Sequence, residues 1–345
     1  MRYDDMYVAG VASWLPPSTD IVAAVAAGIC PPEVAREADV EAVAVSTGEA
    51  PPEMAVRAVR LAVERSGCET SAFALIAYAD THYNGHDLWL ASAYIQRLAV
   101  GNHNPALAVE VRQMSNGGMA ALELAAGYLT GTRQRAAVVA AADRFSLPGY
   151  DRWRSHGGTP LGDGASALVL SREGGFARLL CAVSWTEPEL EGAHRGDDPF
   201  GVAPFSLGQP VNVPAMREAF IARLGADNWA RLTESGRRSA LAHTLKEAEL
   251  RLDQIDWFVL PNLGSRRLTA EYVEPLGIDL ARTSWETWGR RVGHLGAADQ
   301  FAGLEHLLLS GRLREGQYCL LLGSGGDFTW SCALLEVLEQ PAWAG

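Results

Sequence analysis

One serine of the sequence stands where a nucleophile can be activated. Ser115 lies in M-S-N-G-G, between a short apolar, β-prone run and a helical run of small residues. This pattern predicts a buried strand that turns sharply into a buried helix, and ligands of open α/β sheets bind at the carboxyl ends of strands. The free N–H groups at a helix N-terminus stabilise a developing negative charge. The simpler interpretation is a serine that only caps the helix.

A serine nucleophile needs a general base, and the base needs a group that orients it. His294 stands in V-G-H-L-G-A-A-D between two glycines, and Asp299 follows five residues later. Five residues is not a helix-face spacing, so the pair requires a loop at His294 that leads into a helix carrying Asp299. The simpler interpretation of the pair alone is a loop histidine and an aspartate near the positive end of a helix dipole.

Other candidate residues carry weaker signals. His194 lies in the polar run E-G-A-H-R-G-D-D, which favours a solvated loop residue, and it is the second candidate for a base. The glycine-rich turn at residues 323–327 lacks the phosphate-loop pattern and the helix of a dinucleotide fingerprint. It fits either an ordinary hairpin turn or a close backbone approach that offers an N–H to an oxyanion. His82 and His86 have no evident third ligand, so no metal site is expected.

Composition limits the class of protein. The 345 residues suffice for two domains or one large duplicated domain. The formal net charge of -12 argues against a general nucleic-acid or membrane-surface role, although a local basic groove for a phosphate-bearing ligand is compatible with it. No apolar run approaches the roughly 20 residues that span a bilayer, and the N-terminus has no signal-peptide pattern. Five scattered cysteines without metal-ligand spacing are typical of a reduced compartment, so we expect a cytoplasmic protein.

The elements that must position these side chains alternate between strands and helices. Apolar runs predict strands at residues 7–14, 73–79, 106–111, 135–142, 161–170, 176–185, 255–260, 317–322 and 328–335. Helical patterns cover residues 51–65, 88–98, 119–129, 215–224, 239–250 and 299–309, and residues 187–214 are polar and rich in glycine and proline, as in a long loop. This alternation predicts an α/β architecture with largely parallel sheets. The second half repeats the plan of the first, which predicts two similar halves at residues 1–172 and 173–345.

Four segments, in this order, resemble the β-ketoacyl-acyl-carrier-protein synthase III family of the thiolase superfamily. They are L-G-D-G-A-S-A from residue 161, I-D-W-F-V-L-P-N from residue 255, G-H-L-G-A-A-D from residue 293 and G-S-G-G-D-F-T-W from residue 323. The resemblance covers almost the whole chain. It implies the thiolase fold, a duplicated five-layered α-β-α-β-α architecture, and a homodimer.

The chain departs from this family at the catalytic positions. The nucleophilic cysteine of the family falls on Ser115, its catalytic histidine on Asn262 and its catalytic asparagine on His294. Serine has almost no anion at neutral pH and so depends more on a base than cysteine does. The resemblance therefore implies a catalytic set of Ser115, His294 and Asp299. It assigns Asn262 and Gly326 to the oxyanion or to substrate positioning.

Antibiotic-pathway relatives of the family share the G-H-L-G-x-x-D pattern. The resemblance implies an acyltransferase of secondary metabolism that takes an acyl group from acyl-CoA or acyl-carrier protein onto Ser115 and passes it to a small-molecule or carrier acceptor. No permanently bound cofactor, nucleic acid or membrane partner is expected. One alternative is a ketosynthase III-type starter-unit enzyme of polyketide synthesis, which condenses the acyl group with malonyl-carrier protein. Another is a non-catalytic partner subunit.

Overall fold

The computed structural model describes residues 1–203, 206 and 208–344, and within them nine strands form one mixed sheet. The strand order is β5-β4-β6-β7-β1-β8-β11-β10-β9. The bounds are β1 Tyr7–Trp14, β4 Phe73–Ala79, β5 Leu107–Val111, β6 Ala136–Asp143, β7 Gly164–Ser171, β8 Ala177–Thr186, β9 Trp257–Val259, β10 Tyr318–Ser324 and β11 Thr329–Val337. A separate ribbon pairs β2 (Ser18–Asp20) with β3 (Ala42–Ala44).

The sheet contains the same strand pattern twice. The order β4-β6-β7-β1 in one half matches β9-β10-β11-β8 in the other, and the two halves meet where β1 pairs with β8. In both halves the first pair is parallel and the next two are antiparallel. The prediction of largely parallel sheets is therefore wrong. Because helices cover both faces, these antiparallel strands carry the continuous apolar runs that are usually typical of parallel strands.

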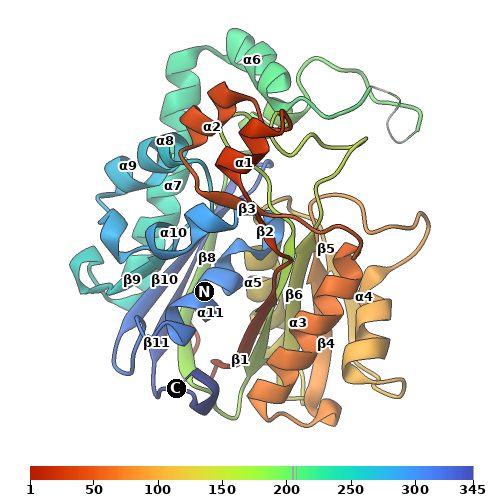
Figure 1. Ribbon diagram of the computed structural model, residues 1–345. Coiled ribbons are helices and arrows are strands. Elements are labelled where there is room, and N and C mark those ends of the chain that lie inside the picture. Colours follow the sequence, from red (N-terminus) through yellow and green to blue (C-terminus); the bar gives the residue numbers. More distant parts are fainter. Residues whose placement is uncertain (204–205, 207, 345) are drawn as a thin grey trace.

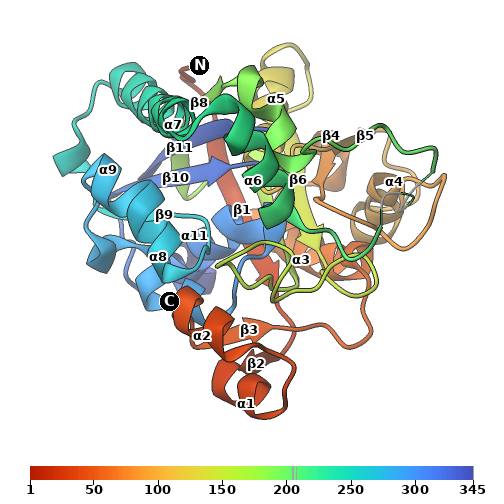
Figure 2. The same cartoon turned by 90° about the horizontal axis from the view of Figure 1, so that it is seen from above.

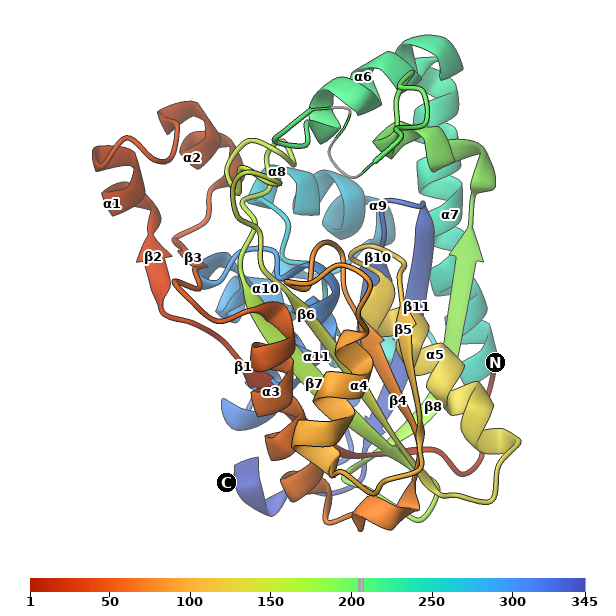
Figure 3. The ribbon, with the colours of Figure 1, turned by 90° about the vertical axis from the view of Figure 1, so that its right-hand side faces the viewer.

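Helices complete five layers around the two halves of the sheet. Between the halves lie α5 (Gly117–Thr130) and α11 (Asp299–Leu309), and each contacts strands of both halves. The outer layers are α3 (Pro51–Ser66) on the first half and α7 (Ala226–Ala248) on the second, and the views in Figures 1 and 3 show them on opposite sides of the molecule. This arrangement confirms the predicted α-β-α-β-α thiolase fold.

Shorter helices and loops surround these layers, and several of them lie over the ends of the central strands (Figures 1 and 2). They are α1 Ile21–Ala26, α2 Pro32–Ala38, α4 Ala91–Ile95, α6 Val213–Leu224, α8 Ser265–Leu268, α9 Glu274–Leu276 and α10 Ser284–Thr287. Figure 2 shows α6 beside α7, over the ends of these strands. The segment 187–214, predicted as a loop, contains a 3₁₀ turn at Pro188–His194, and its residues 204, 205 and 207 lie outside the described part of the chain. No helix in the described ranges combines the length and apolar character needed to cross a bilayer.

The two central helices approach each other closely at their N-termini. A Cβ atom on Gly118 would lie 2.4 Å from the backbone oxygen of Ala297, which precedes α11. A Cβ atom on Gly117 would lie 3.0 Å from the side chain of Ala79 at the end of β4. Only glycine fits these contacts without a shift of the backbone. The start of α5 is therefore packed directly against the segment that leads into α11.

Candidate active site

Ser115 lies on the turn between β5 and α5, as the sequence predicts. The preceding residue, Met114, has a φ of 51°, a left-handed conformation that costs about 1 kcal/mol or more for a non-glycine residue. The buried Asn116 side chain fixes the turn, because its Nδ2 donates to Gln113 Oε1 at 2.7 Å and to Ser331 Oγ at 2.8 Å. The turn thus holds the Ser115 side chain in one place at the end of a strand.

His294 reaches Ser115 from the other half of the chain. Its Nε2 lies 2.8 Å from Ser115 Oγ, and its Nδ1 lies 2.5 Å from Asp299 Oδ2. The backbone around His294 is also fixed, since its N–H donates to Pro160 O at 3.0 Å and its carbonyl accepts from Gly162 N at 2.8 Å. The structure therefore brings Ser115, His294 and Asp299 into one hydrogen-bonded series.

Asp299 is the most heavily bonded side chain of the site. Besides His294, it accepts hydrogen bonds from Leu295 N at 2.8 Å, from Asn262 N at 2.8 Å and from Asn262 Nδ2 at 2.9 Å. A carboxylate only accepts, so the proton between the two side chains sits on His294 Nδ1. The unprotonated Nε2 then faces Ser115 and can accept its hydroxyl proton.

The remaining predicted site residues are Asn262, Gly326 and His194. The Asn262 amide contacts Asp299, on the far side of the His294 ring, so its part in the hydrogen-bond series is to hold the carboxylate. Gly326 lies in the turn between β10 and β11 and lines the same cavity as Ser115. His194 is not a solvated loop residue: it lines this cavity too, so close to Gly326 that a Cβ atom there would lie 2.2 Å from His194 Nδ1.

A cavity of about 570 Å³ opens over Ser115 and His294. Apolar side chains form much of its wall, among them Phe145, Tyr150, Leu161, Leu263, Phe328 and Trp330. Polar side chains from α6, α7 and α8 form another part of the wall, and three arginines are among them. Small-molecule sites are usually mostly apolar, whereas the lining of this cavity is about as polar as it is apolar.

Sequence reasoning missed two arginine–histidine pairs in this cavity. Arg267 Nη1 lies 3.2 Å from His156 Nδ1, and Arg217 Nη2 lies 3.0 Å from His194 Nε2. Burial, together with Arg217 and Arg267, lowers the pKa of His194 to about 3, and burial with Arg267 holds the pKa of His156 well below its usual range. Both imidazoles are therefore neutral at pH 7.

The His156 ring lies beside both of the other imidazole rings of the cavity, those of His194 and His294. The His156 ring centroid lies 6.0 Å from that of His294 and 6.1 Å from that of His194. Within the described residues, these histidines and the neighbouring acids form no group of three or more that could hold a metal ion. No spacing in the sequence relates His156, in a glycine-rich loop, to the helices that carry the two arginines.

Comparisons with known proteins agree on one family. Two family models match the chain: 3-oxoacyl-(acyl-carrier-protein) synthase III over residues 109–186, and the C-terminal region of the same enzyme over residues 245–337. A curated β-ketoacyl-(acyl-carrier-protein) synthase III from Rhizorhabdus wittichii is 28% identical over 291 residues, which is 84% of this chain and 85% of that protein.

Solved structures extend the comparison to the whole fold. ChlB3, described as an acyltransferase, has a TM-score of 0.92 and 35% identity, and the match covers 99% of this chain and 100% of that one. The 3-oxoacyl-(acyl carrier protein) synthase III FabH of Xanthomonas oryzae pv. oryzae has a TM-score of 0.76 at 18% identity, with 97% and 100% covered. The second likeness supports the fold alone.

Proposed function

Because the chain belongs to the 3-oxoacyl-(acyl-carrier-protein) synthase III family, we propose that it is an acyltransferase of secondary metabolism that carries the acyl group on Ser115. The donor is a thioester of coenzyme A or of an acyl-carrier protein. The acceptor is a small-molecule hydroxyl or a second carrier. The observation that carries the proposal is the 2.8 Å contact between Ser115 Oγ and His294 Nε2, in series with Asp299.

The reaction runs in two balanced steps. In the first, His294 Nε2 takes the Ser115 proton while Oγ attacks the thioester carbonyl, and the thiol leaves with that proton. In the second, His294 takes the proton of the acceptor hydroxyl while its oxygen attacks the serine ester, and the proton returns to Ser115 Oγ. Asp299 holds the ring and stabilises the imidazolium in both steps. The backbone N–H groups of Ser115 and Gly326 are the proposed donors to the oxyanion.

Formation of the acyl-enzyme tests this proposal directly. Incubation with short acyl-CoAs should add one acyl mass to the intact protein, on the peptide that holds Ser115. Ser115→Ala should remove the adduct, and His294→Ala should slow its formation by about 10²–10⁴-fold, the usual size of a general-base effect. His243→Ala, an exposed histidine on α7, is the control. An adduct that persists in Ser115→Ala contradicts the assignment, and no adduct with any donor favours a non-catalytic subunit.

Condensation with malonyl-carrier protein is the second candidate function, and the name of the Rhizorhabdus wittichii relative favours it. The position of Asn262 argues for transfer instead. In condensing relatives, a histidine and an asparagine together hold the carbonyl that becomes an enolate. Here Asn262 Nδ2 donates to Asp299, and His294 already serves Ser115. Release of carbon dioxide from malonyl-carrier protein by the acylated enzyme would reverse this ranking.

A homodimer is part of the proposal. Strand β5 is an edge strand of the sheet, and exposed apolar side chains lie on it and on the adjoining helix α5: Leu107, Leu124 and Tyr128 are 51%, 58% and 43% exposed. An unpaired edge beside apolar side chains is suited to pairing with a second copy. A monomer in sedimentation velocity at micromolar concentration would contradict this.

All five cysteines are free, which is compatible with the expected cytoplasmic location.

A further inference from the structure

Three buried N–H groups in the wall of the cavity have no hydrogen-bond partner among the described residues. They are Nε of Arg217 on α6, Nε of Arg237 on α7 and Nδ1 of His194. The guanidinium of Arg217 only donates, so His194 Nε2 accepts from it and the ring proton sits on Nδ1. All three unpartnered atoms are therefore donors. A buried donor without an acceptor costs about 1–3 kcal/mol, so a ligand group that accepts from these donors is favoured.

The charges around these donors favour an anion. Arg217, Arg237 and Arg267 line the cavity, and the one half-buried carboxylate beside them is Glu271. Glu271 already pairs with Arg267, whose Nε lies 3.0 Å from its Oε1. In the described part of the chain, neither Arg217 nor Arg237 has a carboxylate within ion-pair distance. The other acidic residues of the wall, Glu234 and Glu274, are exposed.

The cost of leaving this charge uncompensated is visible at Arg217. Burial and the neighbouring Arg267 lower the pKa of its guanidinium to about 10, although arginine normally stays fully charged far above that value. Glu271 offsets these effects only in part, and an anion beside Arg217 would offset them further. The wall is thus suited to a second negative group in addition to Glu271.

The position of this wall selects the source of the anion. His194 is separated from His294 by one imidazole ring, that of His156, with centroid distances of 6.1 and 6.0 Å. The phosphate of a pantetheine arm lies at the far end of a long chain from the thioester, whereas a short acyl group on Ser115 extends directly into the cavity. A carboxylate carried by that acyl group shares the cavity with the arginines and matches their charge.

We propose that Arg217, Arg237 and His194 form a subsite for the terminal carboxylate of the acyl group, so that the donor is a monothioester of a short dicarboxylic acid. The inference rests on the proposed function in that Ser115 is the acyl carrier. The carboxylate accepts from the guanidinium groups and from His194 Nδ1–H, and these charge-assisted bonds set the choice of acyl chain. The apolar side chains of the wall contact its methylene groups.

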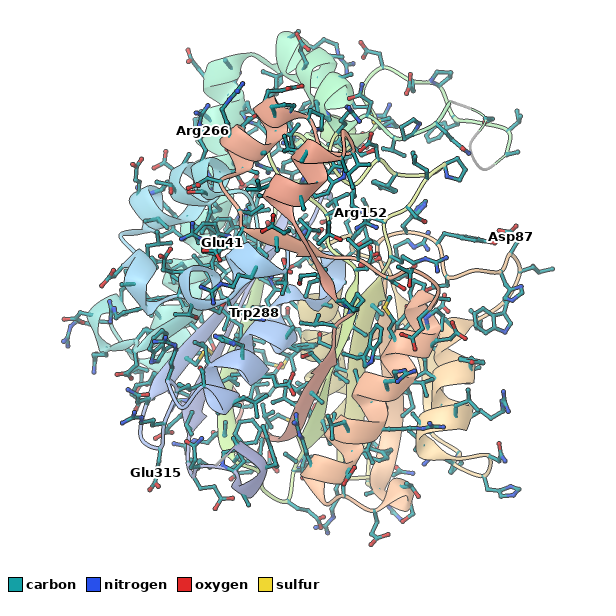
Figure 4. The ribbon with its side chains drawn as sticks, in the orientation of Figure 1. Glu41, Asp87, Arg152, Arg266, Trp288 and Glu315 are labelled. Carbon is teal, nitrogen blue, oxygen red and sulfur yellow. The ribbon has the colours of Figure 1, made fainter. Side chains whose placement is uncertain are left out.

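Binding to the Ser115→Ala protein tests the subsite apart from catalysis. Isothermal titration with glutaryl-CoA and valeryl-CoA compares acyl groups of equal carbon number, and the phosphates common to both cancel. We expect glutaryl-CoA to bind about 10- to 100-fold more tightly, the range that one or two hydrogen bonds to a charged group supply. In this background Arg237→Met should remove most of the preference and Arg217→Met/Arg237→Met all of it, with valeryl-CoA binding unchanged. The control is Arg266→Met, an exposed arginine that Figure 4 shows on the outer surface beside α2 and α8.

Each outcome decides the proposal. Equal binding of the two thioesters to Ser115→Ala overturns it, and so does a glutaryl preference that survives in the double variant. Equal binding with a defect of Arg237→Met confined to the acceptor step assigns the arginines to the acceptor, which also overturns it. A glutaryl preference in a protein whose wild type forms no acyl adduct supports the subsite and contradicts the proposed function. If the wild type forms adducts with valeryl-CoA and glutaryl-CoA but the Ser115→Ala protein binds both with equal affinity, the result supports the proposed function and contradicts the subsite.

Discussion

Replacing Asp299 by asparagine separates two parts of the proposed mechanism, the orientation of the His294 ring and the charge that stabilises it. Each carboxylate oxygen of Asp299 accepts from two N–H donors. Oδ2 accepts from His294 Nδ1 and Asn262 N, and Oδ1 accepts from Asn262 Nδ2 and Leu295 N. Asparagine has nearly the same shape, so no cavity forms. In either orientation, however, its NH₂ group faces two donors.

The loss of acylation rate in Asp299→Asn depends on which orientation of the asparagine amide is more stable. If the NH₂ group faces His294, the ring proton moves to Nε2 and the ring can no longer accept the Ser115 proton; the same change in a serine protease costs about 10⁴-fold in rate. If the oxygen faces His294, the tautomer is kept and only the charge is lost, so the rate falls less. The first orientation leaves one buried donor unpaired, the N–H of Asn262, and the second leaves two, Asn262 Nδ2 and Leu295 N. At about 1–3 kcal/mol for each donor, the free energy of unfolding should fall by about 1–6 kcal/mol.

The double variant Asn262→Asp/Asp299→Asn distinguishes these cases. It restores the hydrogen bond between positions 262 and 299 and keeps an oxygen toward His294, but it moves the carboxylate away from the ring. We expect it to recover about half of the lost stability and to acylate faster than Asp299→Asn alone. The measurements are single-turnover acylation followed by intact mass, and urea unfolding at the same pH. An Asp299→Asn protein of unchanged stability that acylates within about tenfold of wild type would refute this reasoning.

Two further predictions follow from packing and from burial. In Gly118→Ala the new Cβ meets the Ala297 carbonyl oxygen at 2.4 Å, so we expect about 1–3 kcal/mol lower stability in urea and slower acylation; Gly127→Ala, on the same helix with nothing within 4 Å, is the control and should show neither loss. Burial raises the pKa of Asp143 to about 7, above its value of about 4 in the unfolded chain. The folded state therefore binds this proton more tightly, and stability is lost as pH rises from about 4 through 7. The free energy of unfolding of wild type minus that of Asp143→Asn should therefore decrease over that window, by at most about 1.4 kcal/mol per pH unit. A difference that stays constant with pH in urea titrations would contradict the shift.

Local signals in the sequence predicted the turn, the loop and the helix start that carry Ser115, His294 and Asp299, and the family resemblance joined these residues into one set. A strand-to-helix turn positions the serine, and the spacing of His294 and Asp299 predicts a loop that enters a helix. The direction of the Asn262 amide was not readable. It depends on a carboxylate 37 residues away in the chain, and the family position alone fixes where the residue lies rather than what it contacts.

The strand directions and the cluster of Arg217, Arg237 and Arg267 in the cavity wall could not be predicted from the sequence for a different reason. Strands buried on both faces have no alternation, so parallel and antiparallel neighbours give the same apolar run. His156, Arg217 and Arg267 come from a loop and two separate helices, and only tertiary packing brings them together. No periodicity within any one segment records such a contact.

The hydrogen bond between Ser115 and His294 also depends on how the two halves of the chain are aligned. One atom of the pair precedes α5 in the first half of the chain, and the other precedes α11 in the second. A slip of about 1 Å between the halves hardly changes their buried area, yet a misplacement of that size can cost about a hundredfold in rate. In the proposed mechanism, the acylation rate is therefore sensitive to small movements between the two halves that calorimetry would not detect. A substitution that tilts the central helix of one half requires a compensating substitution in the other half, so we expect the two repeats to evolve together.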